Sequence, residues 1–301
     1  MSRKLRANFL LLTTSFIWGS AFVAQRVGME YIGPFTFNAV RLLVAGIALT
    51  FVSLILNRVN PQSKPEPDHK QNKAASKAMF AGGLCCGVIL FLASSFQQVG
   101  LVFTTAGKAG FITTLYIIIV PILGLFLKRK IGRKIWFCVF LALAGLYLLS
   151  FVENMRLNLG DVLMLFCALF YAVHIMVIDH FSQKASAVRL SQIQFIVAAM
   201  LSFVVMFVLE SPSLRNILIS WLPILYVGVL SGAVGFTFQI IAQKDTDPSI
   251  SALLMSFEAV FAAFTGFLIL NEVLTIRELI GCVLMFAAVL VAQLQFKRKS
   301  A

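Results

Sequence analysis

The sequence predicts an all-α integral membrane protein with ten transmembrane helices, arranged as two five-helix halves of inverted topology. Composition is the first observation behind this prediction, because 60% of the 301 residues are hydrophobic, only 12% are charged, and the mean hydropathy is +0.93. So few polar side chains cannot cover the surface of a soluble globule, and a lipid bilayer is therefore the expected solvent. The other two observations are ten long apolar runs and an uneven distribution of basic residues.

Each apolar run is long enough to cross a membrane, since a hydrocarbon core of about 30 Å needs about 20 helical residues. The first half contains runs at residues 8–27, 35–57, 78–100, 104–127 and 133–151. The second half contains runs at residues 160–179, 188–209, 218–242, 249–270 and 275–296. Charged residues, Pro or Gly bound these runs, as Pro34 and Pro248 do. The runs lack the period-2 alternation of a membrane β-barrel, so helices are predicted throughout.

The basic residues predict the orientation of these helices. If the N-terminus is cytoplasmic, 19 of the 25 Lys and Arg residues fall on cytoplasmic segments and four fall outside. This asymmetry follows the positive-inside rule, and it predicts a multi-pass protein of the cytoplasmic membrane with both termini in the cytoplasm. The net charge of +13 is then a consequence of topology, and no nucleic-acid partner is expected.

Three further features receive structural interpretations. The N-terminus resembles a signal peptide, but Phe22 would occupy the −3 position of the cleavage site, so the segment is expected to remain as helix 1. The five cysteines lie in apolar runs without metal-binding spacing, which predicts packing roles and no metal or cofactor. The Pro-rich, charged segment 60–73, inside a cytoplasmic loop at 58–77, is expected to be a solvated linker.

Weak internal similarity predicts that the chain is duplicated. A shift of 142 residues places Gln97 on Gln239 and Gly124 on Gly266, and a shift of about 152 places Trp18 near Phe170. Five helices per half is an odd number, so the second half must enter the membrane inverted relative to the first. The predicted halves are residues 1–151, with helices 1–5, and residues 152–301, with helices 6–10.

Four segments carry a resemblance to a known family. They are WGSAFVAQR (18–26), FNAVRLLVAG (37–46), FQQVGLVFTTAGKAGFITTLYIIIVP (96–121) and, more weakly, FTGFLILNEVLTIRELIG (264–281). Through them the chain resembles the EamA-type ten-helix carriers of the drug/metabolite transporter superfamily. Ala259 departs from the family pattern, which often has proline after the Glu258 position, so the resemblance does not extend to a proline kink in helix 9.

The resemblance implies a secondary active transporter, commonly an exporter or exchanger, of small organic metabolites such as amino acids or amphipathic drug-like solutes. Access would alternate around a central cavity walled mainly by helices 1, 3, 4, 6, 8 and 9. The implied partners are a small-molecule substrate, the bilayer, and a proton or counter-substrate, with the chain a monomer or homodimer. A non-transporting membrane sensor or accessory subunit is the alternative. An enzyme is not expected, because GxxxxGK[ST] and HExxH motifs are absent.

Four ionisable residues lie deep enough in the predicted helices to suggest function, because a charge inside a bilayer costs about 2.5–3.5 kcal/mol on insertion scales. Lys108 either faces the cavity or anchors helix 4, by snorkelling or by a structural ion pair. Glu258, taken as the only acid deep in a span, either carries a coupling proton or bridges helices. His174 is expected to be a neutral core residue rather than a proton relay, and Arg41 a structural contact of helix 2.

Polar and aromatic residues complete the predicted cavity. Gln97 and Gln239 coincide under the repeat, so helices 3 and 8 can offer equivalent amides to one cavity, with interhelical hydrogen bonding as the alternative. Trp18, Phe22 and Gln25 form a stripe on helix 1 that either packs or stacks on the substrate. The candidate substrate-binding residues are Trp18, Phe22, Gln25, Gln97, Gln98, Lys108, Tyr116, Tyr171, His174, Gln239 and Glu258. The glycines expected at close helix crossings are Gly83, Gly87, Gly228, Gly232 and Gly235.

Overall fold

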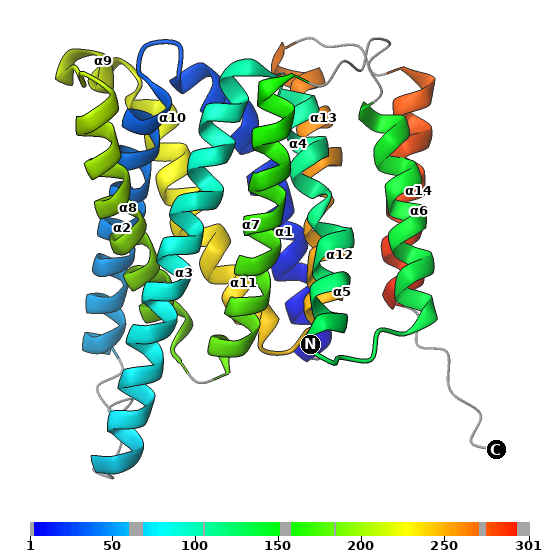
Figure 1. Ribbon diagram of the computed structural model, residues 1–301, viewed down its shortest axis with the longest axis horizontal. Helices are drawn as coiled ribbons and strands as arrows, with labels where there is room; N and C mark the ends of the chain where they lie inside the picture. The colour runs from blue at the N-terminus through cyan, green and yellow to red at the C-terminus, as the bar shows by residue number, and fades with distance from the viewer. Residues whose placement is uncertain are drawn as a thin grey trace.

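The computed structural model describes residues 3–59, 69–104, 106–150, 158–183, 185–270 and 275–293, and these ranges contain helices and no strands (Figure 1). Within these ranges, eight helical units are long and apolar enough to cross a membrane. The prediction of an all-α membrane protein is therefore confirmed. Two further helices of 18 residues, α6 (Arg133–Ser150) and α14 (Ile276–Gln293), pack against each other at one end of the bundle, and the count of ten spans stays a prediction.

The first half begins with three long helices. They are α1 (Arg3–Gly28), α2 (Pro34–Val59) and α3 (His69–Phe103). Pro34 opens α2 at a position where a helix needs no backbone N–H donor. Helix α3 already begins at His69, inside the segment 60–73 that was predicted to be a solvated linker, and residues 60–68 lie outside the described ranges.

The second half begins after the capping box of Asn158 and Asp161, which starts α7 (Leu159–Ser182) and satisfies backbone N–H groups at its first turn. It continues through α8 (Ala187–Leu209) and a short helix, α9 (Leu214–Ile219), that the sequence did not predict. The eighth predicted span consists of α10 (Trp221–Leu225), the π-helix η2 (Tyr226–Gly235) and α11 (Phe236–Gln243). Its middle therefore has a wider helical turn than an α-helix.

Two spans are interrupted at equivalent places in the two halves. In the first half the interruption is at Leu115, between α4 (Ala106–Thr114) and α5 (Tyr116–Phe126). In the second it is at Ser256 and Phe257, between α12 (Pro248–Met255) and α13 (Glu258–Leu270). Beside each interruption, a side-chain hydroxyl donates a hydrogen bond to a backbone carbonyl of the preceding turn. Thr114 donates to Phe111 at 2.8 Å, and Ser256 donates to Leu253 at 2.8 Å. The span formed by α12 and α13 is therefore broken although no proline stands beside Glu258.

The two halves of the chain make equivalent helix contacts. If each helix is replaced by its counterpart in the other half, the set of contacting pairs does not change. Helix α2 packs on α8, and α6 packs on α14, so each of these pairs is its own counterpart. Helix α1 packs on α12 and α13, as α7 packs on α4 and α5. Likewise α1 contacts η2 and α11, as α7 contacts α3. This is the packing that two inverted repeats about a pseudo-two-fold axis require.

The five predicted crossing glycines lie where helices approach closely. Gly83 and Gly87 of α3 face α8, and a Cβ on Gly87 would lie 2.6 Å from Cβ of Val197. Gly228 and Gly232 of η2 face α2 in the equivalent contact, and a Cβ on Gly228 would lie 2.8 Å from the Arg41 carbonyl oxygen. Gly235 lies against Trp18 of α1. Only glycine lets these backbones meet so closely.

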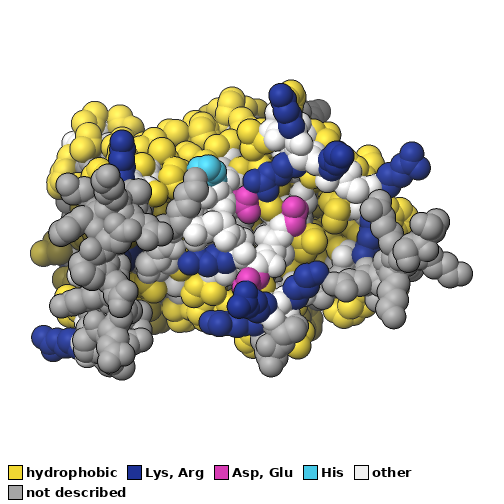
Figure 2. Space-filling model, turned by 90° about the horizontal axis from the view of Figure 1, so that it is seen from below, with side chains coloured by type: hydrophobic (Ala, Val, Ile, Leu, Met, Phe, Trp, Pro, Cys, Tyr) yellow, Lys and Arg dark blue, Asp and Glu magenta, His cyan; other side chains and the backbone are white. Residues whose placement is uncertain are grey.

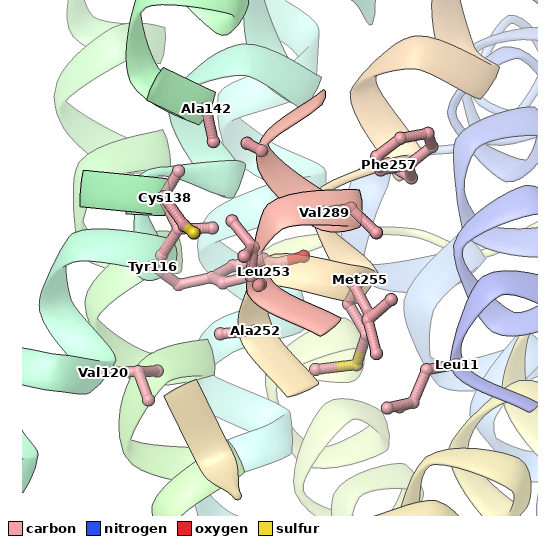
Figure 3. Close-up of a cluster of buried hydrophobic side chains, with 14 of the residues drawn as sticks. Leu11, Tyr116, Val120, Cys138, Ala142, Ala252, Leu253, Met255, Phe257 and Val289 are labelled. Atoms are coloured by element: carbon pink, nitrogen blue, oxygen red, sulfur yellow. The ribbon is translucent and has the colours of Figure 1, made fainter. Parts of the chain in front are cut away.

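A large apolar cluster joins the two interrupted spans to α1, α6 and α14, as Figure 3 shows. Tyr116 and Val120 of α5 meet Leu253 and Met255 of α12 there, and all four are buried. Packing at this density fixes the ends of the interrupted helices in position. The cluster therefore determines where the side chains at the two interruptions point.

Candidate functional site

The centre of the bundle contains a cavity of about 500 Å³, a volume that includes its opening. Its wall comes from both halves and consists of Trp18, Phe22, Gln25, Arg41, Gln97, Thr113, Tyr116, Tyr171, Ile175, Ser231, Phe236, Gln239 and Glu258. Its wall is partly aromatic and aliphatic with a few polar side chains, which is the composition of small-molecule sites. Eight of the eleven predicted substrate-binding residues line it, and Gln98, Lys108 and His174 do not.

Several wall residues are counterparts of one another in the two halves. The shift of 142 residues that relates the interrupted spans pairs Gln97 with Gln239, and both line the cavity. A shift of 153, which pairs Arg41 with Gln194, also pairs Trp18 with Tyr171. The aromatic pair lines the cavity as well. The cavity therefore lies across the pseudo-two-fold axis.

Tyr116 and Glu258 are also counterparts under the shift of 142 residues, and they contact each other directly. The Tyr116 hydroxyl donates a hydrogen bond of 3.0 Å to Oε1 of Glu258. Tyr116 is the first residue of α5 and Glu258 the first residue of α13, so the bond joins the two interruptions. A carboxylate at the start of a helix is favoured by the partial positive charge of that terminus.

Arg41 brings positive charge to the same cavity. It is 8% exposed, and its Nε and Nη2 donate to Oδ1 of Asn38 at 3.1 and 2.8 Å. Among the described residues, no carboxylate oxygen lies within 4.0 Å of its nitrogens. Tyr171 is close enough to interact electrostatically with both Arg41 and Glu258. The cavity thus has a cationic and an acidic group, with an aromatic residue within reach of both.

Two amide oxygens of the wall have no hydrogen-bond donor among the described residues. They belong to Gln25 and Gln239, which are 4% and 1% exposed. A buried carbonyl oxygen without a donor is costly, and such groups in a cavity accept hydrogen bonds from water or a ligand. In contrast, the amide oxygen of Gln97 accepts from the Tyr171 hydroxyl at 3.4 Å.

The three candidates outside the cavity have other partners. His174 is buried against Gln194, with 3.1 Å between its Nε2 and the amide oxygen. Gln98 donates to the sulfur of Met29 at 3.0 Å. Both contacts lie in the helix packing around the cavity.

Lys108 forms an ion pair with Asp161 of α7, with 2.6 Å between Nζ and Oδ2. The carboxylate also accepts hydrogen bonds from the Thr104 hydroxyl at 3.2 Å and from the Asn158 backbone N–H at 2.9 Å. Asp161 is completely buried although it lies in the first turn of α7, at the edge of its apolar run, where an acid usually contacts water. It is therefore a second buried acid beside Glu258, and the prediction that Glu258 is the only acid deep in a span stays a prediction.

Sequence analysis also missed Thr113, Ile175, Ser231 and Phe236 of the wall, and it assigned Arg41 to a purely structural role. Arg41 adds helix 2 to the set of helices expected around the cavity. The internal repeat could have identified one of these missed residues. Ile175 is the counterpart of Phe22, a predicted wall residue, under the shift of 153 residues. Within the described ranges, no group of three or more His, Cys, Asp or Glu residues could hold a metal ion.

Comparison with known proteins decides the family. The model of the EamA-like transporter family matches residues 5–151 and 158–293. This chain belongs to the EamA-like transporter family. It is therefore a multi-pass membrane transporter rather than an enzyme.

Relatives of this EamA-like transporter cover nearly the whole chain. An uncharacterized transporter of Archaeoglobus fulgidus is 31% identical over 296 residues, which are 97% of this chain and 87% of the relative. The uncharacterized transporter YoaV of Bacillus subtilis is 23% identical, with 96% of this chain and 97% of the relative covered. One crystal structure matches with a TM-score of 0.77 at 18% identity, over 100% of this chain and 99% of the other, which shows that the two share a fold.

Proposed function

We propose that this EamA-like transporter is a secondary active exporter or exchanger of small organic metabolites, such as amino acids or amphipathic drug-like solutes. It works by alternating access around the central cavity, from a position in the cytoplasmic membrane with both termini in the cytoplasm. The single observation that carries the proposal is the position of the cavity across the pseudo-two-fold axis, where both interrupted spans contribute wall residues. Carriers with inverted repeats bind their substrates at such an interface.

The wall supports an amphipathic solute. Trp18, Phe22, Tyr116, Tyr171 and Phe236 supply aromatic surface, against which an apolar group is removed from water. The polar groups are few, and a solute with a single charged or polar end and an apolar body satisfies both parts of the wall.

Glu258 is our candidate for the coupling residue. It is 3% exposed and accepts from Tyr116, while Tyr171 and Cys167 are the other titratable groups within electrostatic reach. Arg41 lines the same cavity and is also within electrostatic reach of Tyr171. Protonation of Glu258 would remove one negative charge from the cavity wall, and this change of charge can link solute movement to a proton gradient.

Purified protein in liposomes tests both parts of the proposal. We expect counterflow of a labelled solute into liposomes preloaded with the same unlabelled solute, measured across amino acids and amphipathic amines. Glu258→Gln should abolish accumulation driven by a pH gradient and retain counterflow, because exchange needs no net change of protonation. Gradient-driven accumulation by Glu258→Gln at the parental level would remove this residue from the coupling mechanism.

The alternative, a non-transporting sensor or accessory subunit, gives a different result in the same liposomes. It would bind a solute without moving it. Solute binding with no counterflow of that solute would favour the sensor and count against the carrier. Liposomes without protein provide the control for leakage.

A further inference from the structure

The cavity holds a buried cation, Arg41, that forms no ion pair with any side chain in the described part of the chain. Arg41 lies about 10 Å into α2, at 1.5 Å per residue from Pro34. An arginine guanidinium stays protonated in proteins and has five N–H donors. Asn38 accepts two of them, and the described residues supply no further acceptor for the other three. A full positive charge therefore faces the cavity with donors to spare.

Arg41 donates to the neutral side-chain amide of Asn38, and the orientation of this amide is fixed. The Asn38 amide nitrogen donates to the Ser94 hydroxyl of α3 and to the Ser202 hydroxyl of α8, each at 3.1 Å. These two bonds turn the amide oxygen toward Arg41. Asn38, Ser94 and Ser202 are all 0% exposed, so the three helices clamp the amide in place.

A neutral support distinguishes Arg41 from a structural arginine. A guanidinium that serves only to tie helices together is usually paired with a carboxylate, because an uncompensated buried charge is costly. Lys108 follows this rule through Asp161, and Arg129 follows it through Asp179, with 2.6 Å in each pair. Arg41 is different, since among the described residues its side-chain partner is an amide, and it lines the cavity.

We propose that Arg41 is the residue that selects solutes carrying an anionic group, in the first instance a carboxylate, and that Asn38 positions it. This inference rests on the proposed carrier function and specifies its substrate class. The planar guanidinium can bind both oxygens of a carboxylate at once, which gives strength and a defined direction of approach. The free oxygens of Gln25 and Gln239 then accept from N–H donors elsewhere on the same solute.

Replacing Asn38 by aspartate tests the proposal while Arg41 stays in place. The substitution has nearly the same shape, and the serine hydroxyls can rotate to donate to the new carboxylate. It supplies Arg41 with a permanent counterion, so an anionic solute loses its advantage. The matched control is Gln192→Glu, because the Gln192 amide on α8 donates to the Thr50 hydroxyl of α2 at 3.0 Å, outside the cavity wall.

Tryptophan fluorescence can report binding in the cavity directly. The chain has three tryptophans, and Trp18 is the one in the cavity wall, so Trp136→Phe and Trp221→Phe leave a single reporter. Four probes with the same ring separate the charges: 3-phenylpropionate and L-phenylalanine carry a carboxylate, whereas L-phenylalaninamide and 2-phenylethylamine do not. Each is titrated against the parent, Asn38→Asp and Gln192→Glu in lipid nanodiscs.

We expect the parent to bind the two carboxylate probes more tightly than the other two. Asn38→Asp should weaken carboxylate binding about 10- to 100-fold, the range for a hydrogen bond to a charged group, and change the other probes by less than about threefold. Gln192→Glu should behave as the parent. Equal affinities of the parent for all four probes, no binding of either carboxylate, or an unchanged carboxylate affinity in Asn38→Asp would each overturn the proposal.

The outcome is independent of the test for transport. Counterflow without a preference for carboxylates would leave the carrier standing and refute the role of Arg41. A preference that Asn38→Asp removes, in a protein that shows no counterflow, would refute the carrier and retain Arg41 as an anion-binding residue.

Discussion

Asp161 receives its three hydrogen bonds from three different segments: α4, the turn before α4, and the residue that caps α7. Lys108 is the only one of these donors that brings a positive charge. The side chains of the pair are 14% and 0% exposed, so neither charge is well solvated by water. The pair therefore anchors the start of α4 to the start of α7, and Lys108 does not reach the cavity wall.

We predict that Lys108→Met lowers thermal stability by about 1–3 kcal/mol, because it leaves the buried Asp161 carboxylate without its cation. Adding Asp161→Asn should recover part of the loss, since the double variant no longer buries an uncompensated charge. Unfolding in detergent, followed by light scattering or fluorescence, measures both. Lys108→Arg should fold and transport as the parent does.

Arg129→Met provides the comparison for Lys108→Met, because it also removes the cation of an ion pair. Its ion pair with Asp179 has the same 2.6 Å length, but the side chains are 36% and 16% exposed. Exposed pairs contribute about 0–1 kcal/mol, so the loss should be smaller than for Lys108. Strictly additive effects of Lys108→Met and Asp161→Asn would contradict the view that the two residues stabilise the protein as a pair.

The glutamines and the glutamate of the wall could be predicted from the sequence, whereas Ile175 and Phe236 could not. Gln25, Gln97 and Glu258 stand out because a polar side chain inside a bilayer needs a reason. Ile175 and Phe236 do not stand out, because the residues facing lipid are as apolar as those facing the interior. Phe207 and Val208 of α8, for example, are 69% and 76% exposed. Hydrophobic periodicity, which identifies the inner face of a soluble helix, is therefore weak here.

At the scale of helices, the sequence predicted the order of the apolar segments better than their continuity. The run at 104–127 reads as one helix, yet it is interrupted at Leu115. The run at 218–242 contains ten π-helical residues, whereas its glycines predicted only close helix crossings. Interruptions of this kind depend on hydroxyl side chains and neighbouring helices that accept the released backbone groups, and those are tertiary contacts.

Gly87 tests the close contact between α3 and α8. A Cβ at this position would lie 2.6 Å from Cβ of Val197 and 2.9 Å from the Gln194 carbonyl oxygen, so even alanine forces the helices apart. We predict that Gly87→Ala destabilises the protein by about 1–3 kcal/mol. Gly107→Ala is the matched control, because nothing lies within 4 Å of a Cβ there. Equal thermal stability of the two variants would show that the contact does not limit stability.

At the scale of the molecule, the two faces of the bundle differ in charge. Helix α1 begins and α14 ends at the lower face in Figure 1. Seen from below, in Figure 2, that face carries many Lys and Arg side chains around a polar centre, within a rim of apolar side chains. At the opposite face, Arg26 lies in the last turn of α1 and Arg215 in the short helix α9. The fold thus reproduces the asymmetry from which cytoplasmic termini were predicted.

Orientation can be tested with two cysteines on opposite faces, in a background without the five native cysteines, of which Cys85 is exposed. Ser186 precedes α8 at the lower face and Ser211 follows it at the upper face, and both are exposed. If the positive-inside rule sets the orientation, a membrane-impermeant maleimide should label Ser211→Cys in intact cells and Ser186→Cys only in inverted vesicles. Labelling of Ser186→Cys in intact cells and of Ser211→Cys in inverted vesicles would place the termini outside. Labelling of both from one side would mean that α8 does not cross the membrane, and the inverted repeat would then be wrong.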